Sequence, residues 1–167
     1  DWSSDVCSSD LHGIFATQGS GAYTARRNII NGNTILLEPA TDSTGIHFYG
    51  IYVLGQTELV VVNNSIRGLF ECGINSRGRH VSICNNALAV LDVLGIPDQT
   101  ILRIGIFLYQ STETVVNGNS IRGYGWAVRE SGSNYNIVSG NIMRNNVDDY
   151  DTSSAGGFSQ YPYNMEV

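Results

Sequence analysis

The chain has 167 residues, of which 42% are apolar and only 14% are charged, and its formal net charge is -6. This length suits one domain with one core, and the acidic balance excludes a basic nucleic-acid-binding protein because phosphates would be repelled. The longest aliphatic stretch, 59–62, is far shorter than the roughly 18–20 residues that span a bilayer. We therefore expect neither nucleic acid nor a membrane as a partner.

Residues 1–11 show no apolar periodicity and resemble the translation of a common short-read sequencing adapter. We treat this segment as an artefact, place the start of the native sequence near His12, and expect the chain to be N-terminally truncated. Residues 12–25 are then expected to form a partial coil of the repeat that follows.

A tetrapeptide with Asn at its second position recurs along residues 26–151. These asparagines are Asn33, Asn64, Asn86, Asn119 and Asn141, at intervals of 31, 22, 33 and 22 residues. Apolar residues stand three positions before and two positions after each of them, namely Ile30, Val61, Ile83, Val116 and Val138, and Ile35, Ile66, Leu88, Ile121 and Met143. Such columns predict a repeat whose copies bury their apolar residues by stacking on one another.

Each copy also contains a short strand pattern, which opens with Gly-Ile at Gly50, Gly73 and Gly105 and less regularly at Gly125. Strands this short cannot form an independent sheet, and the Gly and Asn residues between them permit corners with positive φ. The pattern predicts an all-β, single-stranded parallel β-helix of about five coils, with ~4.8 Å between coils. We expect the recurring asparagines to hydrogen-bond to one another along its axis.

With these Asn-anchored turns and Gly-Ile strands, the chain resembles the right-handed parallel β-helix proteins of the pectate-lyase-like superfamily over residues 26–146. The resemblance implies a right-handed solenoid with a polysaccharide lying across one strand face, and it does not assign an activity. A leucine-rich repeat is disfavoured because the chain has no leucine consensus pattern, and a β-sandwich is disfavoured because the asparagines recur in columns.

Two long connections, 36–49 and 89–104, occur at the same point of their coils, and we expect them to project from one edge and flank a groove. The outward positions of the Gly-Ile strands can be assigned if each Ile points inward. They are then Tyr52, Asn75, Phe107 and Ala127, followed two residues later by Leu54, Arg77, Tyr109 and Arg129.

Aromatic rings pack on the C–H faces of sugars, and guanidinium groups suit carboxylates. From the outward positions we therefore expect six substrate-binding residues, Tyr52, Asn75, Arg77, Phe107, Tyr109 and Arg129, and a neutral or anionic polysaccharide as the ligand. The alternative is that these aromatic residues simply fit a pleated surface. Trp126 is expected to face inward and to fill its coil.

Catalytic residues are not assigned from the sequence. Only fragments of the motifs shared by the polygalacturonate hydrolases of the superfamily occur here, and the Asp148-Asp149 pair lies after the last repeat. A lyase would need a basic residue and a carboxylate cluster that holds calcium. The nearest approximation to that set is Glu71, Arg77 and Arg79 with Asp42 and Asp98.

No cofactor and no metal site are expected. His47 and His80 lack metal-ligand spacing. The acidic run Asp148, Asp149 and Asp151 could hold Ca²⁺, but a solvated segment that ends the solenoid is favoured. Residues 152–167 are expected to form a C-terminal cap or tail.

Cys72 and Cys84 are 12 residues apart, roughly half a coil. We expect them on different walls of the solenoid, as buried thiols beyond disulfide reach.

These expectations favour an extracellular, carbohydrate-associated protein that binds, and in one version cleaves, a polysaccharide on its strand face. Two alternatives stay open. The chain is then either a segment of a phage tailspike or surface adhesin, which would recognise surface glycans as a homotrimer, or a purely structural β-helix segment.

Overall fold

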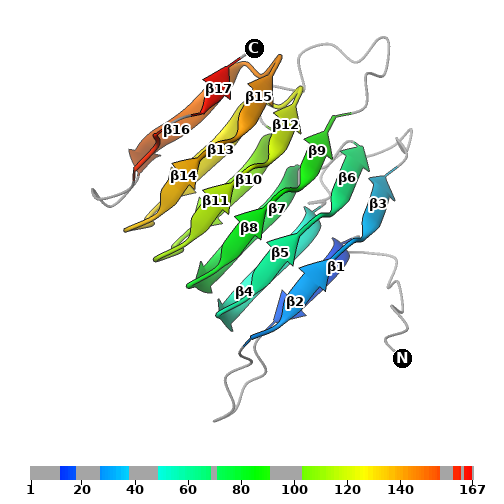
Figure 1. Ribbon diagram of the computed structural model, residues 1–167, viewed down its shortest axis with the longest axis vertical. Helices are drawn as coiled ribbons and strands as arrows, with labels where there is room; N and C mark the ends of the chain where they lie inside the picture. Colours follow the sequence, from blue (N-terminus) through cyan, green and yellow to red (C-terminus); the bar gives the residue numbers. More distant parts are fainter. Residues whose placement is uncertain are drawn as a thin grey trace.

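The computed structural model describes residues 12–17, 27–37, 49–68, 71–90, 103–154, 160–162 and 164–166. Over these residues the chain contains strands and no helix. The strands form three parallel sheets, and successive coils of the chain contribute one strand to each sheet (Figure 1). The predicted all-β parallel β-helix is therefore confirmed.

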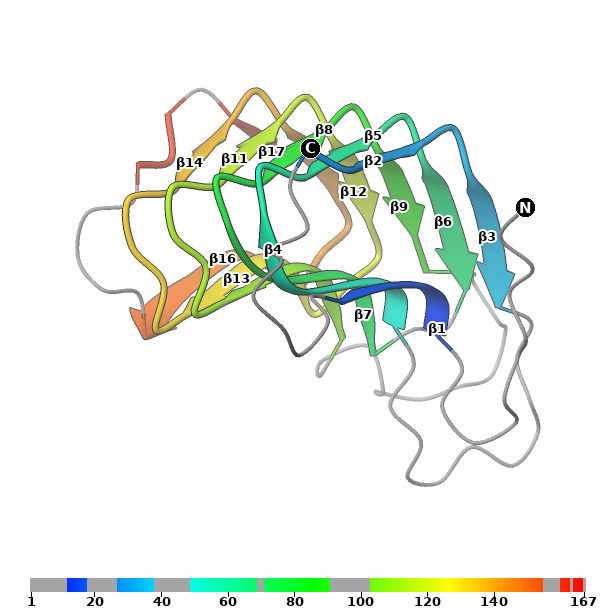
Figure 2. The ribbon, with the colours of Figure 1, turned by 90° about the horizontal axis from the view of Figure 1, so that it is seen from below.

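The three sheets form the walls of the solenoid (Figure 2). Sheet A contains β1 (His12–Thr17), β4 (Tyr49–Thr57), β7 (Cys72–Arg79), β10 (Ile104–Tyr109), β13 (Trp126–Ser131) and β16 (Asp148–Ser154). Sheet B contains β2 (Ile29–Asn31), β5 (Val60–Val62), β8 (Ser82–Cys84), β11 (Val115–Asn117) and β14 (Ile137–Ser139). Sheet C contains β3 (Thr34–Leu37), β6 (Ser65–Gly68), β9 (Ala87–Ala89), β12 (Ser120–Arg122), β15 (Ile142–Arg144) and β17 (Met165–Glu166).

The apolar columns that the sequence predicts form the core. Ile30, Val61, Ile83, Val116 and Val138 lie in register along sheet B, and all five are buried. The column that begins at Ile35 faces them from sheet C, and sheet A adds Ile51, Ile74 and Ile106. Burial of one such side chain stabilises the fold by about 1.5–3 kcal/mol, so stacking makes strands of three residues stable.

An asparagine ladder runs along the corner between sheets B and C, as the sequence predicts. The amide Nδ2 of each asparagine donates to Oδ1 of the asparagine in the next coil, over 2.9–3.0 Å. The same Oδ1 accepts the backbone N–H of the preceding asparagine. Each buried amide is thereby satisfied in a corner that water cannot reach.

The ladder has a sixth member, Asn164, which the sequence pattern does not identify. Asn141 donates to Asn164 Oδ1 from both its backbone and its side chain. Strand pairing also continues there, since β17 pairs with β15 and Gln160 bridges to Ile137. The predicted end of the repeats at residue 151 lies inside β16, and part of the predicted tail, 152–167, belongs to a sixth coil.

Candidate functional site

The six predicted substrate-binding residues all lie on sheet A. Tyr52 comes from β4, Asn75 and Arg77 from β7, Phe107 and Tyr109 from β10, and Arg129 from β13. Tyr52, Asn75, Phe107 and Arg129 are partners in register across four neighbouring strands. Arg77 and Tyr109 stand two residues further along their strands, on the same face. The structure therefore brings the six residues onto one surface.

The register in the fifth coil differs from the prediction. Arg129 is the partner of Phe107, and Ala127 falls opposite Gly105 with its side chain fully buried, so Ala127 is not an outward residue. The prediction was wrong because it aligned this coil on Gly125, whereas Ala127 takes the place that glycine holds in the preceding coils. Arg129 therefore belongs to the same column as Tyr52, not to the column of Tyr109.

Two aromatic clusters lie on this face, one at each end. At the first, the ring centroids of Tyr49 and Tyr52 are 5.1 Å apart and stacked, and those of Phe15 and Tyr52 are 5.3 Å apart. At the second, the rings of Phe107 and Tyr109 are 5.6 Å apart. Half of Phe15 is exposed, at 48%. The aromatic surface thus begins on β1, one coil earlier than expected.

One arginine connects these clusters, and a second extends the surface to β13. Arg77 donates from Nη1 to the Tyr52 hydroxyl over 3.3 Å, and its Cζ lies 4.2 Å from the centroid of the Tyr109 ring. Arg129 lies over Phe107 at 5.8 Å and over Trp126 at 4.7 Å. Guanidinium groups over ring faces are attracted by the ring quadrupole. We call this continuous surface the sheet A band; it comprises Phe15, Tyr49, Tyr52, Asn75, Arg77, Phe107, Tyr109, Trp126 and Arg129.

Three members of the band were not predicted from the sequence. Phe15 follows Gly13-Ile14, which is the same Gly-Ile signal as in later coils and was overlooked because no recurring asparagine precedes it. Tyr49 directly precedes Gly50 and stacks outward. Trp126, expected inside the coil, is only partly buried, is not part of the core cluster, and lies beside Arg129.

Asn75 lies between the two clusters and is only 5% exposed. Its Oδ1 has no hydrogen-bond partner within the described part of the chain. An unsatisfied buried acceptor costs free energy, and here it places a polar atom in the floor of the band between Tyr52 and Phe107, its partners in register.

Burial raises the pKa of several ionisable side chains on and below this face. Burial, and secondarily the nearby Glu71 carboxylate, raises the pKa of Tyr49 to about 12. Burial also raises the pKa of the Cys72 thiol and of the Tyr124 hydroxyl. At neutral pH Tyr49 is therefore an uncharged hydroxyl that can donate a hydrogen bond, and Cys72 is a thiol without nucleophilic character.

Among the residues considered for lyase chemistry, Glu71 and Arg79 lie within the described ranges and stand far apart. Glu71 precedes β7 and Arg79 ends it, and eight residues of extended strand separate them by roughly 26 Å. Arg79 is bound to Glu113 at the corner between sheets A and B. Asp42 and Asp98 lie outside the described residues, as do most of the two long connections expected to flank a groove. Both connections run from sheet C to sheet A, so they share one corner.

Among the described residues, no group of three or more His, Cys, Asp or Glu side chains could hold a metal ion. In the acidic run considered for calcium, Asp151 pairs with Arg129 over 2.9 Å, and Asp149 accepts a hydrogen bond from Asn146. His47 lies outside the described residues, and His80 contacts Glu113.

Across the described ranges, no helix is long and apolar enough to span a membrane.

The two cysteines within the described ranges lie on different walls, as expected. Cys72 begins β7 in sheet A, and Cys84 ends β8 in sheet B. Both are free thiols; Cys72 is buried and Cys84 is partly buried.

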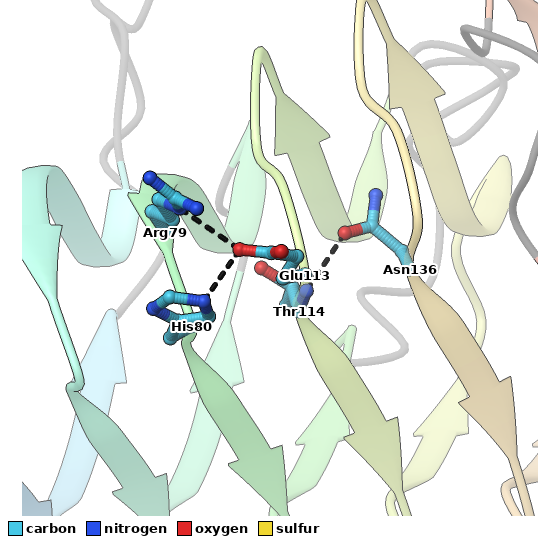
Figure 3. Close-up of polar contacts among 5 residues, drawn as sticks. All are labelled: Arg79, His80, Glu113, Thr114 and Asn136. Atoms are coloured by element: carbon cyan, nitrogen blue, oxygen red, sulfur yellow. Dashed lines mark hydrogen bonds and ion pairs between the residues drawn. The ribbon is translucent and has the colours of Figure 1, made fainter.

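A charged cluster occupies the corner between sheets A and B. Arg79 Nε and His80 Nε2 both contact Glu113 Oε2, over 2.8 Å and 2.5 Å (Figure 3). The hydrogen bond from Arg79 is the largest cause that lowers the pKa of Glu113 from 4.5. Because its pKa is lower in the folded chain, the ionised Glu113 stabilises the fold above the ordinary carboxyl pKa, and this contribution is lost as the pH falls through the lowered value.

We expect the Glu113→Gln variant to unfold at a lower urea concentration than the native chain at pH 7, because it lacks the ion pair with Arg79 and alters the contact with His80. The difference between the two should be smaller at pH 3, because the carboxyl group of the unfolded chain binds a proton below its ordinary pKa and the stabilisation by the carboxylate is lost as the pH falls toward the lowered pKa of the folded state. Urea midpoints at the two pH values test this. The Glu58→Gln variant, which alters the neighbouring pair with Arg27, is the control and should leave the contribution of Glu113 intact. An equal difference at both pH values would show that Glu113 acts through packing.

Comparison of the chain with protein-family models, with curated proteins and with solved structures found no match in any of the three.

Proposed function

We propose that this chain is an extracellular or surface carbohydrate-binding β-helix, which holds a polysaccharide along the sheet A band. The observation that supports this function is the continuity of the band. Aromatic rings and guanidinium groups follow one another from β1 to β13, each in contact with the next. An extended polymer that lies along the solenoid axis would meet all of them.

The chemistry of the band fits sugar rings. The apolar C–H faces of a pyranose pack on Tyr and Phe, and aromatic contacts contribute beyond the area that they bury. Arg77 contacts the Tyr52 hydroxyl and the ring of Tyr109, neither of which is a carboxylate, so its positive charge is available for hydroxyl or carboxylate oxygens of a ligand. Arg129 already binds Asp151, which makes Arg77 the main anion-recognising group. Both neutral and anionic polysaccharides suit this set, and catalysis is not part of the proposal.

The proposal predicts that the triple variant Tyr52→Ala, Arg77→Gln, Phe107→Ala loses retention in native gels that contain polysaccharide. We expect an affinity loss of about 100-fold or more, since the variant removes two ring platforms and the central guanidinium. The gels should contain polygalacturonate, xylan or mannan in turn. Release of reducing ends or of unsaturated uronate in the same samples would show that the binder also cleaves.

A matched control changes a tyrosine, an arginine and a large apolar residue away from the band. The triple variant Tyr135→Ala, Arg27→Gln, Ile137→Ala removes an exposed tyrosine, an exposed arginine and a large exposed apolar side chain from the A–B corner and sheet B. It should retain native binding. Equal retention by both variants, or none by the native chain on any of the three polymers, would contradict the proposal and favour a purely structural β-helix.

A further inference from the structure

Asn75 is buried in the sheet A band, and its side chain has no hydrogen-bond partner within the described part of the chain. Its partners in register, Tyr52 and Phe107, lie on the outer face, so Asn75 also points outward from β7, yet it is only 5% exposed. Its Oδ1 is buried without a partner, and its amide nitrogen donates no hydrogen bond within the described ranges. The floor of the band thus contains an amide that the chain itself does not satisfy.

The other buried asparagines show that the fold otherwise satisfies this side chain. In each of them the amide oxygen accepts and the amide nitrogen donates a hydrogen bond within the chain; they are Asn64, Asn86, Asn119, Asn136 and Asn141. A buried amide without partners costs free energy. Asn75 is therefore of a kind expected where a ligand supplies the missing hydrogen bonds.

Aromatic side chains flank Asn75 on both sides. Tyr52 stands one coil before it and Phe107 one coil after it, so that their backbones are about 9.6 Å apart. Both side chains are longer than asparagine, which places the amide below the level of the rings. A sugar that packs its C–H face on either ring directs its hydroxyl groups sideways, and one edge of the sugar then meets Asn75.

The amide group limits which hydroxyl pattern fits. It presents one acceptor and two donors in one plane, with the oxygen and the nitrogen side by side. Two hydroxyl groups on neighbouring ring carbons match this pattern, because one donates to Oδ1 while the other accepts from Nδ2. Since neither amide atom of Asn75 is bonded within the described ranges, the amide can also turn over and accept the reverse order without losing a hydrogen bond.

We propose that Asn75 selects glycans whose linkages leave two neighbouring ring hydroxyls free, and that it binds this pair with both of its amide atoms. The inference rests on the function proposed for the sheet A band and deepens it. A 1,4-linked glucan keeps the hydroxyls on C2 and C3 free. In a 1,3-linked glucan O3 belongs to the linkage, so no two free ring hydroxyls are neighbours, and Asn75 gains at most one hydrogen bond.

Arg77 gives the ligand access to this amide by turning aside. It stands two residues after Asn75 on the same face, and its guanidinium reaches back to the Tyr52 hydroxyl over 3.3 Å and to Gln110 Oε1 over 3.5 Å. These distances are longer than those of most N–H···O hydrogen bonds. Neither partner is a carboxylate, so hydroxyl oxygens of a ligand replace both contacts without breaking an ion pair.

Two isomeric hexasaccharides test the selectivity in calorimetric titrations of the full chain. Cellohexaose is β-1,4-linked and laminarihexaose is β-1,3-linked; both consist of glucose and carry no charge. We expect the native chain to bind cellohexaose about tenfold more tightly, the effect of one or two neutral hydrogen bonds. Equal affinities, tighter binding of laminarihexaose, or no binding of cellohexaose would overturn the inference.

The variant Asn75→Leu should reduce this preference to about twofold or less, because leucine has nearly the size of asparagine but no polar atom in its side chain. The control Asn117→Leu makes the same change at an exposed amide on β11 in sheet B, and it should keep the native preference. An undiminished preference in Asn75→Leu would mean that the shapes of the two glucans decide the selectivity, which excludes the role assigned to Asn75.

Stability distinguishes this role from a structural one. Because the change removes an unsatisfied buried amide, Asn75→Leu should unfold at a urea concentration no lower than that of the native chain. A residue that binds only its own fold would show the opposite. Lower urea midpoints for both Asn75→Leu and Asn75→Ala would show that the fold needs the amide, and the inference would then be wrong.

The inference and the proposed function fail separately. Equal binding of both hexasaccharides by the native chain, lost in the triple variant of Tyr52, Arg77 and Phe107, would leave the band as a glycan site and remove only its selectivity. Native-like retention of that triple variant in polysaccharide gels would contradict the proposed function itself.

Discussion

The Asn119→Ala variant is expected to lower the free energy of unfolding by about 3–5 kcal/mol, because it removes the middle of the asparagine ladder. Asn119 Oδ1 accepts both the backbone N–H and the side-chain amide of Asn86, and Asn119 Nδ2 donates to Asn141 Oδ1 and to the Ile83 carbonyl. All these groups are buried in the fold. The variant leaves several of them without partners in a corner closed to water.

Urea unfolding followed by circular dichroism measures this effect. The control is Asn117→Ala, two residues earlier in the same coil, where the amide is exposed and bonds to Ser139. Because water replaces an exposed hydrogen bond, this control should lose less than about 1 kcal/mol. Similar losses for Asn117→Ala and Asn119→Ala would show that the ladder adds nothing beyond ordinary surface hydrogen bonds.

A second large loss is expected for Gly105→Ala, by about 2–4 kcal/mol. A Cβ atom at this position would lie 2.5 Å from Ile121 Cγ2 and 2.6 Å from the backbone oxygen of Ala127. Both neighbours are fully buried, and a carbonyl in a sheet cannot move aside. Gly50 and Gly73 meet equivalent obstacles in their own coils.

The fifth coil suggests a partial rescue of this variant. There Ala127 takes the glycine position, and the sheet C residue of that coil is Met143, which has no branch at Cβ. In the double variant Gly105→Ala, Ile121→Met the clash with Cγ2 disappears while the contact with the carbonyl remains. We expect it to be more stable than the sum of the single changes by about 1 kcal/mol or more. Strict additivity in thermal unfolding would mean that the glycine is required by the backbone alone.

The fold could be predicted from the sequence because the repeat places the same residue types at the same points of each coil. Ile30, Val61 and Ile83 were identified as one buried column by their spacing from the recurring asparagines, and the structure stacks them in register. Asn164 could not be predicted in this way because Tyr161 stands three positions before it, where earlier coils have Ile or Val, and Glu166 stands two positions after it, where earlier coils have an apolar residue. The prediction therefore depended on a complete local pattern and failed where only the asparagine was present.

Six residues of the band could be predicted from the sequence, but the contacts among them could not. The ring that lies beside Arg129 depends on the register of the fifth coil. This register was not evident from the sequence, because Ala127 takes the place that glycine holds in the preceding coils. The corner cluster could not be predicted at all, since His80 and Glu113 adopt positive φ of 53° and 55°, a conformation that sequence patterns assign to Gly and Asn. Their meeting also depends on the length of the connection 91–102, which determines that residues 33 apart stand in adjacent coils.

The asparagine ladder has a consequence for how coils of unequal length coexist. The connection between sheets B and C has two residues in every complete coil, since β2 ends at Asn31 before β3 begins at Thr34 and this spacing recurs up to β14 and β15. The intervals of 31 and 33 residues differ from those of 22 through segments that run from sheet C to sheet A. Amide pairing thus fixes the length of the connection at the corner between sheets B and C. Insertions are accepted between sheets C and A, where the length of the connection can vary without changing the pairing of the asparagines.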